Sequence, residues 1–142
     1  MGKEIGHPSE SGTEIDIFEY LTKFGDGVVH NLHWDGYQED HKSAGGRASI
    51  PGLSQGWHTF GLLWTDQEYV FYVDGKETWK SNEAVSIRSE YIILSLEVGK
   101  WAGNIAEAQL PDSFYVDYIR VYQKNTDGPS SSVAGQKAPP EE

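Results

Sequence analysis

Apolar and aromatic residues occur along the chain in short runs separated by Gly, Asn and Asp clusters, a pattern typical of β-strands and not of helices. The clearest runs cover residues 15–20, 28–34, 58–64, 69–73, 91–98 and 114–122. Asp74-Gly75 separates the run at 69–73 from a strand-like stretch at 76–80, and this dipeptide suits the positive φ angles of a type I′ turn. The pattern predicts an all-β fold, an antiparallel β-sandwich.

Composition divides the chain into a body and two ends. Residues 1–13 are rich in Gly, Ser and Glu and are interpreted as an N-terminal extension. Residues 124–142 contain a single bulky apolar residue, Val133, so this segment cannot bury enough surface to offset its ordering entropy. We expect a folded body over residues 14–123, followed by a linker or disordered tail.

Length and charge exclude several classes of protein. A chain of 142 residues suits one core, and its longest apolar run, five residues at 69–73, is too short to span a membrane. The absence of cysteine excludes disulfides, zinc-thiolate sites and a cysteine nucleophile. Twenty-two acidic against eleven basic residues give a net charge of -11, which argues against nucleic acid as a partner. The residues after Met1 lack the apolar core of a secretory signal.

The segment Glu14-Ile-Asp-Ile-Phe-Glu19 carries three carboxylates among β-formers. On a regular strand Glu14 and Asp16 share a face, whereas Glu19 points the opposite way. A β-bulge between Asp16 and Glu19 would reverse that parity, so that all three acids project together and the apolar residues face the core. The Cα atoms of Glu14 and Glu19 would then lie about 13 Å apart along the strand. If the two side chains lean inward, their carboxyl groups could approach the separation of roughly 5 Å that a retaining glycosidase uses.

Two interpretations of these acids stay open at this point. The acids can form a solvated strand face that only adds solubility. Alternatively, Asp16 controls the charge of its neighbours by sharing a proton, so that one carboxyl stays protonated at higher pH and can act as an acid. Three like charges on one strand face cost stability, which argues for a function.

The acidic segment resembles the catalytic signature of glycoside hydrolase family 16, in its form with two residues between Asp and the second Glu. Later landmarks of that family resemble further segments of this chain in the same order, over residues 12–123. They are Asn31-Leu-His-Trp34, Gly56-Trp-His-Thr-Phe60, Trp64-Thr65, Phe71-Tyr-Val-Asp-Gly75 and Val116-Asp-Tyr-Ile-Arg-Val-Tyr122. The resemblance implies a jelly roll of the concanavalin A type and hydrolysis by double displacement.

The resemblance also implies a role for each acid. Glu14 would be the nucleophile, Glu19 the acid that protonates the leaving oxygen and later activates water, and Asp16 the residue that controls the electrostatics between them. His33 matches a family position near the trio and shares strand parity with Asn31, so both are expected to bind substrate.

Tryptophans offer apolar faces for sugar stacking, although most tryptophans of a β-sandwich are core residues. Trp34 and Trp101 sit at strand ends before Asp-Gly and Ala-Gly and are assigned to the cleft, and Trp101 matches a family position on its rim. Trp57, Trp64 and Trp79 are assigned to packing.

The expected substrate is a β-linked polysaccharide, a β-1,3- or β-1,3-1,4-glucan. Two alternatives remain. One is a galactan of the agarose type, because Glu97 stands where acids enter the cleft of galactan-cleaving relatives, although a net charge of -11 disfavours sulfated polymers unless a local basic patch offsets it. The other is a carbohydrate-binding sandwich without catalysis.

No cofactor is required by the expected mechanism. Asp117 matches a calcium ligand of family members, but one carboxylate does not make a calcium site, which needs six to eight oxygens. In the family about half of the jelly roll precedes the acidic motif, whereas thirteen residues do here. The resemblance therefore implies a domain incomplete at its N-terminus, with edges that a second chain could cover, and an extracellular or periplasmic protein.

Overall fold

A computed structural model describes residue 7 and residues 10–124. The chain divides into two parts, residues 1–109 and residues 110–142, and the larger part contains every strand of the described residues. Within the described residues no helix is long and apolar enough to cross a membrane. The predicted tail at 125–142, and all of the N-terminal extension except residues 7 and 10–13, lie outside the described residues.

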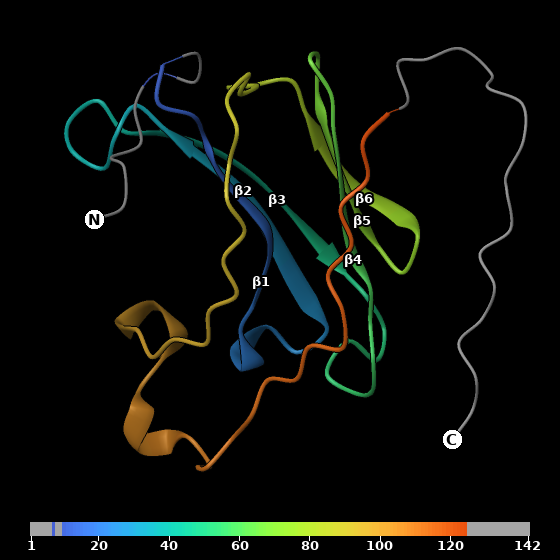
Figure 1. The fold of residues 1–142 in the computed structure, drawn as a ribbon. Helices are drawn as coiled ribbons and strands as arrows, with labels where there is room; N and C mark the ends of the chain where they lie inside the picture. The colour runs from blue at the N-terminus through green and yellow to red at the C-terminus, as the bar shows by residue number, and fades with distance from the viewer. Residues whose placement is uncertain (1–6, 8–9, 125–142) are drawn as a thin grey trace, which may run out of the picture. The chain divides into compact units, whose positions relative to one another are not determined.

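Six strands form two antiparallel sheets of three strands (Figure 1). The first sheet has the order β1-β2-β3 and the second β4-β5-β6. Their bounds are β1 Glu14–Tyr20, β2 Gly27–Trp34, β3 Lys42–Ser49, β4 Phe60–Trp64, β5 Tyr69–Val73 and β6 Lys76–Ser81. Three short 3₁₀ helices complete the elements: η1 Thr22–Phe24, η2 Lys100–Ala102 and η3 Ile105–Glu107. The predicted all-β sandwich is confirmed.

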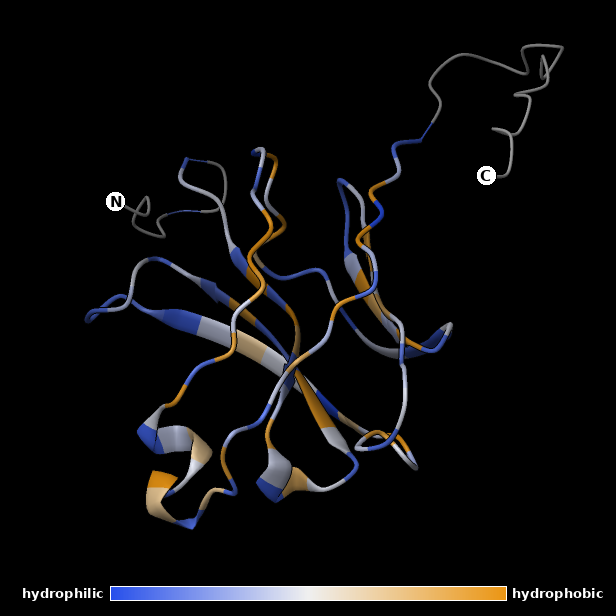
Figure 2. Ribbon diagram, turned by 60° about the horizontal axis from the view of Figure 1, so that its bottom comes forward, coloured by the Kyte–Doolittle hydropathy of each residue, from blue (hydrophilic) through white to orange (hydrophobic). Residues whose placement is uncertain are grey.

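The core lies between the two sheets, where β1 faces β4 and β3 faces β6. One cluster centres on Val28, Leu53 and Val73, and the other on Leu32, Tyr69 and Phe71. Apolar and polar residues are interspersed along the strands (Figure 2). Alternation therefore gives each sheet one face that packs inward and one that faces away from the core.

The predicted hairpin between β5 and β6 is confirmed. Val73 pairs with Lys76, so Asp74 and Gly75 form the two-residue loop. Their φ angles of 50° and 74° are the positive pair that a type I′ turn requires.

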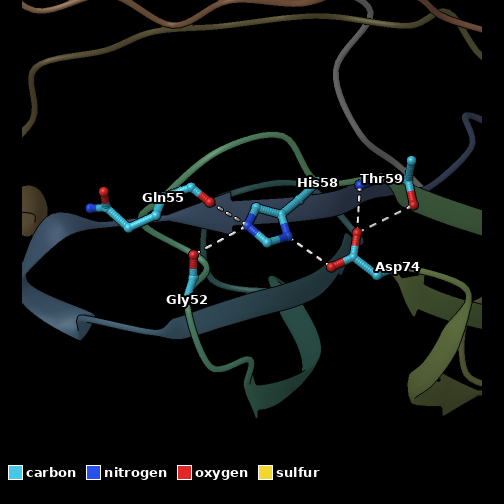
Figure 3. A network of polar contacts seen from close by, with 5 residues as sticks. All are labelled: Gly52, Gln55, His58, Thr59 and Asp74. Carbon is cyan, nitrogen blue, oxygen red and sulfur yellow. Dashed lines mark hydrogen bonds and ion pairs between the residues drawn. The ribbon is translucent and has the colours of Figure 1, made fainter.

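His58 ties this hairpin to the loop that follows β3 (Figure 3). Its Nδ1 lies 2.7 Å from Asp74 Oδ2, and its Nε2 lies 3.2 Å from the carbonyl oxygen of Gly52 and 3.0 Å from that of Gln55. Because every one of these partners is an acceptor, both ring nitrogens must donate and the imidazole is cationic. The hydrogen bond to Asp74 raises the pKa of His58, and the same bond lowers the pKa of Asp74.

The sequence pattern was wrong about two strands and missed a third. Residues 91–98 are extended but pair with no described strand, and their large apolar side chains are exposed. The segment runs beside β1 (Figure 1), tied at its ends by Thr13 N donating to Glu90 Oε1 at 3.3 Å and by Lys23 Nζ donating to the carbonyl of Trp101. Strand-forming residues favour extended backbone, but a ladder also needs an aligned partner.

Strand β3 was missed because its sequence, Lys42-Ser-Ala-Gly-Gly-Arg-Ala-Ser49, has no large apolar residue. It nevertheless pairs with β2 along its whole length. Its inward residue Gly46 lies against the ring of Trp79, so that a Cβ atom there would overlap the indole. A strand that packs under a large aromatic side chain needs small residues, and these carry little signal in a hydropathy pattern.

The three tryptophans assigned to packing differ in how they are surrounded in the structure. Trp79 packs against the cluster around Leu32, and Trp64 donates from Nε1 to the carbonyl of Ser86 at 2.9 Å. Trp57 is 71% exposed, so its assignment to packing is wrong. It precedes β4 in a loop, where strand alternation does not apply.

In the smaller part, residues 110–124 are described as extended chain. The predicted strand at 114–122 forms no ladder there, and its aromatic and β-branched side chains are exposed. The Arg120 guanidinium lies 4.3 Å from the centre of the Tyr118 ring.

Candidate active site

A β-bulge lies where the acidic segment requires it. In the register between β1 and β2, Asp16 pairs with Asn31 and Glu19 pairs with Val29. Two residues of β1, Ile17 and Phe18, therefore stand opposite the single residue between them on β2, His30. The extra residue restores Glu19 to the face of Asp16, which confirms the prediction made from strand parity.

The first sheet carries three cross-strand rows on its outer face. Each row contains one acid of β1, one residue of β2 and one of β3: Glu14–His33–Ser43, Asp16–Asn31–Gly45 and Glu19–Val29–Arg47. Ile15, Phe18 and Tyr20 of β1 pack against the core, and Phe18 stacks on Phe60 with 3.9 Å between ring centres. The bulge thus separates a polar face from the core.

Asp16, the central acid of the row, has a strongly raised pKa. Burial raises the pKa of Asp16 to about 8, and the charges of Glu14 and Glu19 and a hydrogen bond to Glu14 add to the effect. At neutral pH Asp16 therefore carries a proton, which it donates to Glu14. A protonated residue between two acids keeps three carboxyls close together without three charges.

Asn31 fixes the other outer acid. Its Nδ2 donates a hydrogen bond to Glu19 Oε2. The same side chain fills the space above Gly45, where a Cβ atom would overlap Asn31 Oδ1. Glycine at position 45 therefore leaves room for the amide that orients Glu19.

His33 stands beside Glu14 in the register and contacts the central acid. Its Nε2 lies 3.5 Å from Asp16 Oδ2, and its Nδ1 lies 3.0 Å from Nε2 of His41. Tyr37 lies in the same cluster, with its ring tilted against that of His41 and 5.7 Å between the ring centres. The sequence reasoning missed Tyr37 and His41, which lie between β2 and β3. Their position in a loop that joins two strands of the acidic sheet could have indicated these two residues, because such loops often carry functional side chains.

A hollow of about 290 Å³ opens at the Glu19 end of the acidic row. Its lining residues are Glu19, Leu21, Lys23, Phe24, Val29, Asn31, Arg47 and Trp101. The Arg47 guanidinium lies 4.1 Å from the centre of the Phe24 ring. Trp101 is 51% exposed, and its indole covers Gly99, where a Cβ atom would overlap the ring. The hollow combines an acid, an amide, a cation and aromatic faces, which are the groups that hold a sugar ring.

The family model of glycosyl hydrolases family 16 matches residues 5–120, most of the chain. This chain belongs to glycosyl hydrolase family 16. The acidic row is therefore found in a member of a family of glycosyl hydrolases, and the resemblance carried by the segment Glu14–Glu19 is confirmed.

Three curated proteins are similar to this chain over part of their length. The clotting factor G alpha subunit of Tachypleus tridentatus is 25% identical over 88% of this chain and 19% of its own. Endo-1,3-1,4-beta-glycanase ExsH of Rhizobium meliloti (strain 1021) is 26% identical over 80% and 24%, respectively. A beta-glucanase of Fibrobacter succinogenes (strain ATCC 19169 / S85) is 30% identical over 54% and 24%. The chain thus spans about a fifth to a quarter of the length of these relatives.

Trp34, predicted to bind substrate, lies away from the acidic face of this family 16 chain. Trp34 lies on the core face of β2 and packs against the cluster around Leu32. The prediction that Trp34 lines the cleft is therefore corrected. The physical reason is strand parity, because Trp34 follows His33 and must point the other way. Glu97 lies in the extended segment 91–98, where it accepts from Ser95 Oγ at 2.9 Å, and it does not line the hollow.

Asp117, the residue that matched a calcium ligand, lies in the smaller part of the chain. Among residue 7 and residues 10–124 no group of three or more His, Asp or Glu residues could hold a metal ion. Calcium requires six to eight oxygen ligands, so Asp117 as a calcium ligand stays a prediction.

Proposed function

We propose that this chain provides the catalytic acids of a retaining endo-glycosidase that cleaves a β-linked polysaccharide, a β-1,3- or β-1,3-1,4-glucan. The observation that carries the proposal is the bulge, which gathers Glu14, Asp16 and Glu19 on one face with a proton held on Asp16. The glucanase and glycanase names of the relatives support the substrate class. Because such polymers lie outside cells, an extracellular or periplasmic location accompanies the proposal.

In the first step the Glu14 carboxylate attacks the anomeric carbon while Glu19 protonates the glycosidic oxygen, so that the leaving sugar departs and a glycosyl ester forms on Glu14. In the second step Glu19 takes a proton from water, which attacks the same carbon and frees Glu14. Asn31 donates to Oε2 of Glu19, which leaves Oε1 available for the proton that moves.

Asp16 supports the nucleophile in this scheme. Its proton is donated to Glu14, so Glu14 presents a carboxylate without a third negative charge beside it. His33 contacts Asp16 from the neighbouring strand and holds it between the outer acids. The hollow beside Glu19 provides a place for the sugar that leaves, with Trp101 as a stacking face.

The test is a panel of polysaccharides assayed for reducing ends with the 142-residue chain. Glu14→Gln and Glu19→Gln should each lower release from laminarin or lichenan by about 10³-fold or more. Glu83→Gln is the matched control, because it removes an exposed carboxylate of the loop after β6 that lies outside the hollow. Binding of glucan without any release of reducing ends would replace the enzyme by a carbohydrate-binding sandwich.

A second candidate, hydrolysis of a galactan that carries acidic substituents, is favoured by the cations of the hollow. The Arg47 guanidinium lies against the Phe24 ring and forms no hydrogen bond or ion pair within the described residues, and Lys23 lines the same hollow. An unpaired guanidinium beside Glu19 suits a sulfate or carboxylate on the sugar. These two residues form a local basic patch in a chain of net charge -11.

A further inference from the structure

His30 is a fully buried polar residue in the core between the two sheets. Its ring lies 5.0 Å from that of Phe71 and 6.5 Å from that of Trp79, measured between ring centres. It occupies the position on β2 that stands opposite the two bulged residues Ile17 and Phe18. A histidine at this depth must satisfy both ring nitrogens.

Both nitrogens have partners, and the partners belong to different sheets. Nδ1 lies 2.7 Å from the carbonyl oxygen of Ile17 in β1, and Nε2 lies 2.9 Å from Oγ1 of Thr78 in β6. A carbonyl only accepts, so Nδ1 carries the proton. Burial lowers the pKa of His30. Nε2 shares a hydrogen bond with the Thr78 hydroxyl.

Thr78 is itself held by an irregularity in the second sheet. Phe71 pairs with Trp79 and Tyr72 with Glu77, so Thr78 is the extra residue of a bulge in β6. Its Oγ1 lies 3.1 Å from the carbonyl oxygen of Phe71 as well as 2.9 Å from His30. The imidazole therefore connects the bulge of β1 to the bulge of β6 through the core.

We infer that His30 is a positioning residue for Glu19: by holding the Ile17 carbonyl it fixes the bulge that turns Glu19 toward Glu14 and Asp16, and Thr78 holds His30. Without this hydrogen bond the bulged stretch gains a route to the regular register, in which Glu19 points to the opposite face. The consequence for catalysis rests on the proposed function, whereas the consequence for the side-chain arrangement does not.

The first experiment measures the side-chain arrangement in the absence of substrate. The titration of the Asp16 carboxyl is followed by NMR in the wild type, in His30→Phe and in Leu32→Val, a control substitution in the same core. Burial, the Glu14 charge and then the Glu19 charge raise the pKa of Asp16. His30→Phe turns the Glu19 charge away and should therefore lower that pKa, whereas Leu32→Val should leave it in place. An unchanged Asp16 titration in folded His30→Phe would overturn the inference.

Thr78 provides a milder pair of variants should His30→Phe fail to fold. Thr78→Val removes the hydroxyl and keeps the volume, and Thr78→Ser restores the hydroxyl. Thr78→Val should shift the Asp16 titration in the same direction as loss of His30, and Thr78→Ser should return it to the wild-type curve. Equal curves for Thr78→Val and Thr78→Ser would count against a role for the Thr78 hydroxyl and overturn the connection through the core.

The second experiment uses turnover and separates this inference from the proposed function. If the wild type releases reducing ends, His30→Phe should lower kcat about tenfold or more with KM within about twofold, because the change acts on Glu19 and not on sugar contacts. Wild-type kcat in His30→Phe would overturn the inference. A wild type that hydrolyses no polysaccharide, together with a shifted Asp16 titration in His30→Phe, would remove the glycosidase proposal and support the positioning role of His30.

Discussion

Gly45 lies opposite Asn31 in the register between β2 and β3, and the Asn31 side chain occupies the space that a Cβ atom on residue 45 would need. The same Cβ atom would lie 3.0 Å from the backbone oxygen of His30, which cannot move away as a flexible side chain would. The small residue in β3 and the amide that holds Glu19 are thus two parts of one arrangement.

Gly45→Ala should therefore displace Asn31 and weaken its hydrogen bond to Glu19. We expect turnover to fall about tenfold or more, because a misplaced acid loses much of its contribution to catalysis. Gly61→Ala in β4 is the matched control, since its Cβ atom would meet Tyr72 Cβ at 3.6 Å, an ordinary contact. Reducing-end assays on both variants test this expectation, and equal rates for the two would contradict it.

The raised pKa of Asp16 predicts how stability depends on pH. Between the unfolded value of 3.8 and the folded value of about 8, the folded chain binds a proton that the unfolded chain has lost. Unfolding free energy contributed by this group therefore falls as pH rises through that interval. Asp16→Asn removes the titration and should gain stability over the wild type, on the order of a few kcal/mol near pH 8. Urea unfolding of both proteins at pH 5 and pH 8 measures the difference. An equal change in unfolding free energy between these two pH values in both proteins would refute the prediction.

Turnover should respond to the same group at the alkaline end. Above about pH 8 Asp16 ionises, loses the proton that it donates to Glu14 and adds a third charge to the row. Wild-type activity should decline there, and Asp16→Asn, whose amide still donates, should lack that decline. Asp16→Ala has no donor and should be weaker at every pH. The pH profile of kcat/KM for the three proteins tests this expectation. The same alkaline decline in the wild type and in Asp16→Asn would mean that a group other than Asp16 causes it.

The parts of this fold and site that follow from local pattern could be predicted from the sequence. The bulge between Asp16 and Glu19 follows from parity, because three acids on one face and apolar residues on the other require an extra residue. The hairpin at Asp74-Gly75 follows from turn chemistry. The same parity that placed His33 with Asn31 also places Trp34 on the core face, so that error could have been avoided.

Other parts depend on contacts between distant segments. Strand β3 is recognisable only once Trp79 is known to cover Gly46. His30 lies in an apolar run and looks like a packing residue until Thr78, 48 positions later, is placed beside it. The segment 91–98 has strand composition, yet no described strand aligns with its backbone. Pattern gives the preference of each segment, and pairing decides whether a ladder forms.

His58 predicts a second pH effect, confined to the β5–β6 hairpin and the loop after β3. The pKa of His58 is raised, so its contribution to stability is present below 6.5 and is lost as pH rises through the folded value. The pKa of Asp74 is lowered, so its contribution is present above 3.8 and is lost as pH falls through the folded value. The Thr59 N–H donates to Asp74 Oδ1 at 2.9 Å. Protection of this amide hydrogen, taken relative to the intrinsic exchange rate at each pH, should be greatest between these limits.

His58→Gln is the variant for this effect, and the loss at pH 6 should be about 1 kcal/mol or less, because the pair is partly exposed. The variant should remove the alkaline fall in Thr59 protection and leave the Asp16 titration unchanged. The same alkaline fall in Thr59 protection in His58→Gln and in the wild type would show that His58 does not hold this loop.

Arg47 distinguishes the two substrate classes considered for the hollow. On a polysaccharide with sulfate or carboxylate groups, Arg47→Gln should raise KM about tenfold or more, since a charge-assisted hydrogen bond is lost. Arg47→Lys keeps the charge without the planar guanidinium, so its KM should lie between those of the wild type and Arg47→Gln. On neutral laminarin both variants should stay within about twofold of the wild type. Equal losses on acidic and neutral polymers would mean that Arg47 binds sugar hydroxyls, and the neutral glucan would then be the better substrate.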